Sequence, residues 1–175
     1  MANSYLNKTI GTPSNADKMT ISVWVKRSKL SSSQVILGDY ADADNRSKLR
    51  FRTDDQLEYF QEISNSTNIQ VKTNRVFRDT SAWYHILVQI DTSLATANDR
   101  IKFYINGIQE SAANLTYSTA ITQNQDIRIN TSGLNLQIGQ SGNSNEYFEG
   151  YISHIALVDN AIVAPTSFGE TDSTS

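Results

Sequence analysis

The sequence predicts an all-β protein, and three observations point to that class. Apolar residues alternate with polar ones along short segments that recur every ~8 to 15 residues, as half-buried strands do. No window shows the three-four apolar spacing of an amphipathic helix over three turns. Ser, Thr and Asn are abundant, whereas Ala-, Leu- and Glu-rich stretches are missing. Together they predict an antiparallel sandwich or barrel, with residues 1–175 as one domain.

The clearest strand pair lies at 84–90 and 100–105. In the first strand, Ile86, Val88 and Ile90 share a face; the second gives the same face Ile101, Phe103 and Ile105. Asn106-Gly107 then supplies two residues that tolerate positive φ, as a type I′ turn requires. We therefore expect a hairpin there, with Ile105 opposite Ile108 and the six apolar residues buried in one core.

The other elements follow from the same alternation and from turn residues. Expected strands before the pair cover 4–8, 19–27, 34–37, 48–52, 56–60 and 69–73. Expected strands after it cover 127–129, 134–138 and 148–158. Phe77 is expected to be buried, and 164–168 to form one helical turn. Segments 39–47, 111–119 and 139–146 are read as polar loops or connections.

Composition excludes several classes of partner and site. The net charge is −3 and the pI about 5.3, so we expect neither nucleic acid nor anionic lipid as a partner. The absence of cysteine rules out disulfides and thiolate metal sites. No apolar run approaches the ~20 residues of a membrane span, so membrane insertion is not expected. The start lacks a basic segment followed by an apolar one, so we expect no signal peptide.

Three stretches together resemble the concanavalin A-like lectin/glucanase superfamily, and within it the laminin G-like modules. The first is ISVWVKR at 21–27, a strand with a central tryptophan. The second is WYHI at 83–86 leading to FYING at 103–107, and the third is FEGYI at 148–152. The resemblance implies a jelly roll of two packed antiparallel sheets, whereas composition alone leaves sandwich and barrel open.

A narrower resemblance is to laminin G-like modules in tail and appendage proteins of bacteriophages, marine ones especially. The segments MANSYL, VKRS, FRDTSAWYH and SFGETDSTS carry it. It implies a virion location, and a chain cut from a longer fibre protein at Ser175. The implied partners are host-surface glycan and other virion proteins, further copies of this chain among them.

Catalytic residues are not expected. Hydrolase relatives in the superfamily carry E-x-D-x-E on one strand, so that two carboxylates share a cleft. The nearest match here is EYFQE at 58–62, where Phe60 replaces the central aspartate. His85 and His154 each lie within a strand and lack a nearby nucleophile signature, so a structural histidine with a satisfied hydrogen bond is favoured over a catalytic base.

Calcium is the one cofactor for which the sequence offers candidate ligands. Asp39, Asp42 and Asp44 place three carboxylates in one predicted loop, with Asn45 beside them. Calcium takes six to eight oxygen ligands, and many laminin G-like modules bind it at a loop rim. The glycine and distal glutamate of an EF-hand are missing. The alternative is a solvated acidic turn.

Candidate glycan contacts lie in the two polar loops. Aromatic faces pack on apolar sugar faces, and amides bind hydroxyls. The residues with this chemistry are Tyr40, Gln140, Asn143, Asn145 and Tyr147. Trp24 and Trp83 belong to strands, so packing against the sheets is expected of them instead.

The predicted function is non-catalytic adhesion to host-surface glycan by a module of a phage tail fibre or another appendage. The alternative is a structural decoration or spacer module that binds neighbouring virion proteins. The position of exposed aromatic residues separates the two. A cluster around a concavity favours glycan, and a flat apolar patch on a sheet face favours a protein partner.

Overall fold

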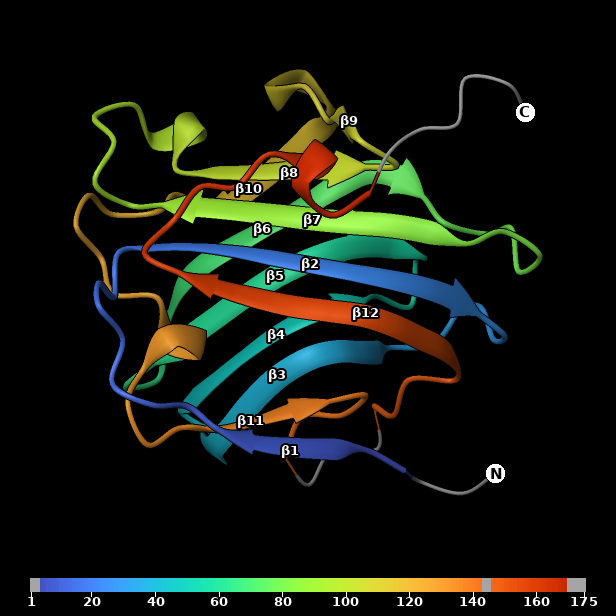
Figure 1. Ribbon diagram of the computed structural model, residues 1–175, viewed down its shortest axis with the longest axis horizontal. Coiled ribbons are helices and arrows are strands. Elements are labelled where there is room, and N and C mark those ends of the chain that lie inside the picture. Colours follow the sequence, from blue (N-terminus) through green and yellow to red (C-terminus); the bar gives the residue numbers. More distant parts are fainter. Residues whose placement is uncertain (1–3, 143–145, 170–175) are drawn as a thin grey trace.

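The protein is a sandwich of two antiparallel sheets, as predicted (Figure 1). The computed structural model describes residues 4–142 and 146–169. The seven-stranded sheet has the order β1-β11-β3-β4-β5-β6-β10, and the five-stranded sheet the order β12-β2-β7-β8-β9. The strands are β1 (Leu6–Thr9), β2 (Lys18–Arg27), β3 (Gln34–Asp42), β4 (Asn45–Phe51), β5 (Gln56–Ile63), β6 (Ser66–Val76), β7 (Tyr84–Asp91), β8 (Ile101–Ile105), β9 (Ile108–Gln109), β10 (Leu115–Thr119), β11 (Asn135–Ile138) and β12 (Gly150–Asp159).

Four short 3₁₀ helices are the helical content of the described residues. They are η1 (Ala97–Asp99), η2 (Ala112–Asn114), η3 (Arg128–Asn130) and η4 (Pro165–Ser167). The last of them confirms the helical turn predicted at 164–168. Among residues 4–142 and 146–169, no helix has the length and apolar character that crossing a membrane requires.

One apolar core fills the space between the sheets. The six residues predicted for it on β7 and β8 have at most 2% of their surface exposed, and they belong to one cluster: Ile86, Val88, Ile90, Ile101, Phe103 and Ile105. Phe77 also joins this cluster, as predicted. Ile21, Val23 and Val25 of β2 point into it, so Thr20, Ser22 and Trp24 point to the outer face of the five-stranded sheet.

The β8–β9 hairpin has the predicted turn. Asn106 and Gly107 have φ values of +51° and +80°, and Ile105 pairs with Ile108. The two isoleucines differ in burial, because β9 is a two-residue strand at the sheet edge. Ile105 is buried, and Ile108 is 73% exposed.

Two segments predicted to be loops contain strands in the structure. β3 continues through Gly38 to Asp42, and β4 begins at Asn45, so the acidic segment 39–47 is a β-hairpin rather than a loop. Its register pairs Asp39 with Ser47, and tertiary contacts to Asp39 permit a carboxylate inside a strand. The connection 111–119 contains β10, which pairs with β6. The strand expected at 127–129 is wrong, because Arg128–Asn130 form η3 and Ile127 is its N-cap residue.

The predicted polar loop 139–146 packs on the molecule rather than standing free. Gly139, Gln140 and Ser141 are buried, and Glu146 is half-buried. The Val35 amide donates to the Glu146 carbonyl at 2.9 Å, and Ser141 Oγ donates to the Asp39 carbonyl at 2.9 Å. This segment therefore covers part of β3, and residues 143–145 lie outside the described part of the chain.

The segment after β12 returns across the outer face of the five-stranded sheet, where Figure 1 shows η4 in front of β7 and β8. Thr20 Oγ1 donates to the Ala161 carbonyl at 2.7 Å and accepts from the Val163 amide at 3.0 Å. Gln89 Nε2 donates to the Val163 carbonyl at 2.9 Å. These bonds fix the path of the segment, and with it the position of Phe168.

Candidate functional site

A row of three side chains crosses the outer face of the five-stranded sheet. Ser153 of β12 pairs with Trp24 of β2, and Trp24 pairs with His85 of β7. The Trp24 and His85 rings are stacked, with centroids 5.0 Å apart and 18° between their planes. His85 Nε2 lies 2.8 Å from Ser22 Oγ. The row gives the half-buried Trp24 a fixed orientation on the sheet surface.

His85 is a structural residue of this row, as the sequence suggests. Only 5% of its surface is exposed. Burial lowers its pKa, so the neutral ring is favoured. The Asn106 amide donates to the His85 carbonyl at 2.9 Å, and the His85 amide donates to Asn106 Oδ1 at 2.8 Å. The β8–β9 turn is thereby joined to the strand that carries His85.

Trp83 lies directly before β7, two residues from His85, and so on the same side of the strand. Its surface is 41% exposed. Its ring centroid lies 6.3 Å from that of Tyr151, which is 64% exposed. The expectation that both tryptophans pack against the sheets therefore holds for Trp24 but is wrong for Trp83, which presents much of its indole to solvent.

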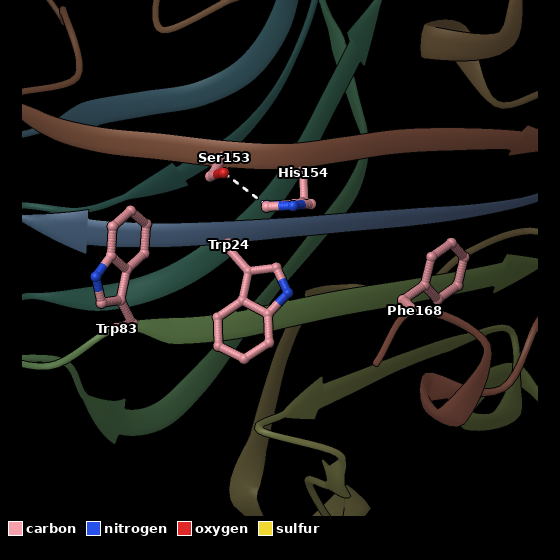
Figure 2. Close-up of a pocket in the computed structure, with 5 residues that line it drawn as sticks. All are labelled: Trp24, Trp83, Ser153, His154 and Phe168. Atoms are coloured by element: carbon pink, nitrogen blue, oxygen red, sulfur yellow. Dashed lines mark hydrogen bonds between the residues drawn. The ribbon is translucent and has the colours of Figure 1, made fainter. Parts of the chain in front are cut away.

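The two tryptophans line a hollow that we call the indole hollow. It has a volume of about 480 Å³ and is lined by Trp24, Trp83, Ser153, His154 and Phe168. Figure 2 shows Trp24 between Trp83 and Phe168, with Ser153 and His154 reaching in from β12. A second hollow of about 420 Å³ shares both tryptophans and extends to Asn106 and η4.

The indole hollow combines apolar faces with a few polar atoms. Ser153 Oγ and His154 Nδ1 form a hydrogen bond of 2.6 Å at its edge. Indole faces suit apolar faces of a ligand, and hydroxyl and imidazole groups suit its polar edges. Sequence reasoning missed this site, although the alternation of Ile21, Val23 and Val25 around Trp24 is a signal that this side chain lies on the face opposite the core.

The described residues among the predicted glycan contacts lie elsewhere: Tyr40 is in β3, and Gln140 and Tyr147 are in the segment between β11 and β12. Tyr40 of β3 is half-buried, and its ring packs so closely on Gly142 that this position has no room for a side chain. Gln140 is 4% exposed and donates to the Gly142 carbonyl. Tyr147 is half-buried, and the other two predicted contacts, Asn143 and Asn145, lie outside the described residues. The structure thus brings segment 139–142 against Tyr40.

Tyr40 also lines a smaller hollow of about 320 Å³. The remaining walls come from Asp39, Ala41 and segment 132–135. Gln140 and Tyr147 are not among the residues that line it. The predicted contact residues come from two segments far apart in the sequence, and this hollow includes only Tyr40 of them.

The three acidic residues predicted for calcium face different surroundings. Asp39 is 1% exposed; it accepts from Ser47 Oγ, and Arg128 Nη2 lies 2.7 Å from its Oδ2. Burial raises the pKa of Asp39 despite these partners. Asp42 is exposed and accepts from the Asp44 amide and the Asn45 side chain. Within the described ranges, no group of three or more His, Cys, Asp or Glu residues is arranged to hold a metal ion.

Glu58 and Glu62 are both paired with arginines. Glu58 is fully buried and lies 2.7 Å from Arg50 and from Arg52. Burial works to raise the pKa of Glu58, but Arg50, Gln70 and Arg52 outweigh it and leave the pKa lowered. Glu62 lies 2.8 Å from Arg46. These pairs join neighbouring strands of the seven-stranded sheet.

Comparison with protein families gives a match over most of the chain. Residues 2–166 match the Laminin_G_3 family, described as the concanavalin A-like lectin/glucanases superfamily. No curated protein sequence matches the chain significantly.

Three solved structures illustrate the likeness of fold. Domain 4 of AbnA, a GH43 extracellular arabinanase from Geobacillus stearothermophilus in complex with arabinotriose, has a TM-score of 0.62 at 18% identity, over 88% of this chain and 66% of that one. The SAP-like pentraxin of Limulus polyphemus has a TM-score of 0.61 at 16% identity, over 91% of this chain and 71% of that one. The CBM40 of the Ruminococcus gnavus IT-sialidase has a TM-score of 0.64 at 12% identity, over 97% of this chain and 100% of that one. The chain thus spans about two thirds of the first of these, and at such identities the likeness concerns the fold alone.

Proposed function

The chain belongs to the concanavalin A-like lectin/glucanase superfamily, and from that premise we propose that it is a glycan-binding module whose main contact is the indole hollow. The observation that carries the proposal is the pair of tryptophans around one hollow. Sugars bind to aromatic faces through their apolar C–H surfaces, while nearby polar groups bind their hydroxyls. Arabinotriose in the domain 4 structure is a saccharide ligand on a similar fold, which supports the same class of ligand here.

The proposal extends to adhesion. The resemblance of segments such as FRDTSAWYH to phage appendage modules supports a place in a virion tail fibre or other appendage, where the glycan is on the host surface. Tyr40 of β3 and Tyr147, which precedes β12, are proposed as a second, weaker contact. The module is proposed to be non-catalytic, because Glu58 and Glu62, the nearest match to a hydrolase carboxylate pair, are each held in arginine pairs.

Trp83→Ala tests the proposal directly. Loss of one aromatic ring that stacks on a sugar typically removes ~1 kcal/mol or more of binding free energy, so the affinity measured on a glycan array should fall about five- to tenfold or more. Trp83 is 41% exposed, so its loss should leave the melting temperature almost unchanged. Tyr5→Ala is the matched control, since Tyr5 is an aromatic residue with 43% exposure outside the hollow. Equal binding by both variants would contradict the assignment of the hollow.

A structural spacer role is the second candidate, and exposed apolar residues beside the hollow favour it. Ile108, 73% exposed, lines the second hollow, and the 64% exposed Tyr151 lies next to Trp83. A protein partner would cover these residues. The test is whether multivalent protein binds glycan and host cells, or binds a neighbouring virion protein instead. If it binds no glycan or host cell, but forms a complex with a virion protein that Ile108→Glu abolishes, the spacer role replaces the glycan proposal.

A further inference from the structure

A β-bulge in β12 determines which side chains reach the indole hollow. The register between β12 and β2 shifts between Ser153 and Ala156. Within that bulge His154 has a φ of +48°, a left-handed conformation that residues with a Cβ rarely adopt. In a regular strand, successive side chains point to opposite faces. Here Ser153 and His154, although consecutive, both line the hollow (Figure 2).

The hydrogen bond between these two side chains leaves a defined set of free groups. If Ser153 Oγ donates to Nδ1, the neutral ring keeps its hydrogen on Nε2, so Nε2–H is a donor and Ser153 Oγ an acceptor. If Nδ1–H donates to Ser153 Oγ, the hydroxyl hydrogen is the donor and Nε2 the acceptor. In both tautomers the pair presents one donor and one acceptor besides the bond that it makes internally.

A sugar hydroxyl is the matching group, because it donates and accepts at once. A carboxylate accepts only, and would leave the acceptor of the pair without a partner. Among the described residues that line the indole hollow or its neighbour, none is Lys, Arg, Asp or Glu. A charged saccharide group would therefore lose water there without gaining an opposite charge.

We propose that the Ser153–His154 pair reads hydroxyl groups in the indole hollow, and that the hollow selects neutral saccharides over their anionic counterparts. This inference rests on the glycan-binding function proposed above. The aromatic walls fix the apolar face of the sugar, and the bulge aims the pair at its edge. The left-handed conformation of His154 supports this placement, since such outliers cluster at ligand sites.

The test is an array of matched pairs, in which each neutral oligosaccharide stands beside the same oligosaccharide capped by sialic acid or a uronate. The whole chain is applied as wild type, Ser153→Ala, His154→Gly and Trp83→Ala. Glycine suits a φ of +48°, so His154→Gly should keep or raise the melting temperature while removing the ring. We expect the wild type to bind the neutral members about fivefold or more tightly than the anionic ones. Either Ser153→Ala or His154→Gly should lower the affinity for the neutral members about two- to tenfold.

The other outcomes are separable. Wild type that binds neither member of any pair overturns both the inference and the proposed function. Anionic members that bind as well as or better than neutral ones, with binding lost in Trp83→Ala, overturn the selection for neutral saccharides but leave glycan binding in place. If Ser153→Ala and His154→Gly leave the binding of neutral saccharides unchanged, the inference is also overturned, because the pair then does not contact the sugar hydroxyls.

Discussion

The indole of Trp24 lies parallel to the imidazole of His85, with 5.0 Å between ring centroids and 18° between planes. His85 is 5% exposed, and its Nε2 is 2.8 Å from Ser22 Oγ. Burial lowers the pKa of His85, so protonation would place a charge beneath the hollow at a cost in desolvation. Trp24 of the indole hollow thus stacks on a histidine whose neutral form is favoured by burial.

This arrangement predicts a stability that depends on pH. The folded-state pKa of His85 lies below the unfolded value of about 6.5, so the unfolded chain takes up the proton first as pH falls. Stability is complete above about pH 6.5 and declines as pH drops toward the folded pKa. Thermal melts at pH 7.5 and 5.5 should show this decline in wild type and a smaller one in His85→Gln. His154→Asn, the control, should retain the wild-type decline; an undiminished decline in His85→Gln would assign it to other groups.

The type I′ turn makes Gly107 a position where backbone conformation alone is tested. Its φ is +80°, and a Cβ there would meet no atom within 4 Å. Gly107→Val should therefore destabilise the fold by about 1–2 kcal/mol through the left-handed conformation rather than through a clash. Gly11→Val is the matched control, because a Cβ at Gly11 also meets nothing within 4 Å and its φ is not in that region. Urea unfolding of the two variants would measure the difference, and equal stabilities would contradict the turn assignment.

The parts of the fold that sequence predicted are those where local pattern and turn chemistry agree. The β7–β8 core face and the Asn106-Gly107 turn are of this kind, because alternation and positive φ are both properties of neighbouring residues. Phe77 followed from a single large apolar residue at the entry to a central strand. No distant contact is needed to predict any of them.

The parts that sequence could not predict depend on distant partners. Asp39 was assigned to a loop because aspartate disfavours strands, but Arg128, 89 residues away, pairs with it inside β3. The indole hollow needs β2, β7, β12 and the returning segment that carries Phe168. Alternation alone is enough to indicate the non-core face for Trp24, but only the register of three strands brings it beside Ser153 and His85.

The partners of Asp39 also predict its response to metal. Its carboxylate is held by Arg128 and Ser47, and Asp42 is engaged by Asp44 and Asn45. We expect millimolar calcium, compared with a chelator, to leave the melting temperature unchanged, since a native-state ligand would raise it. Asp39→Asn should lower the melting temperature by removing the partner of Arg128, and the exposed Asp42→Asn should not. If calcium instead raises the melting temperature, and either substitution abolishes that rise, the metal site is supported after all.

The last prediction concerns affinity in an assembled appendage. One hollow with two indoles and one hydroxyl-imidazole pair offers a small contact, so a single domain should bind its glycan only at high micromolar affinity or weaker. Coupling four copies to streptavidin should raise apparent affinity by ~10²–10⁴, because several weak sites engage one surface together. Cell or glycan binding measured by biolayer interferometry should show this gain in wild type.

On the same tetramer, Trp83→Ala should lose most of that gain, whereas Tyr147→Ala should reduce it less, since Tyr147 belongs to the second proposed contact. Tyr147 is half-buried, so its melt decides how the result is interpreted. An unchanged melting temperature with weaker binding supports a contact role at the loop. Unfolding of Tyr147→Ala would instead make Tyr147 a packing residue, and Tyr40 alone would then remain of the second proposed contact, so that multivalency would act mainly through the indole hollow.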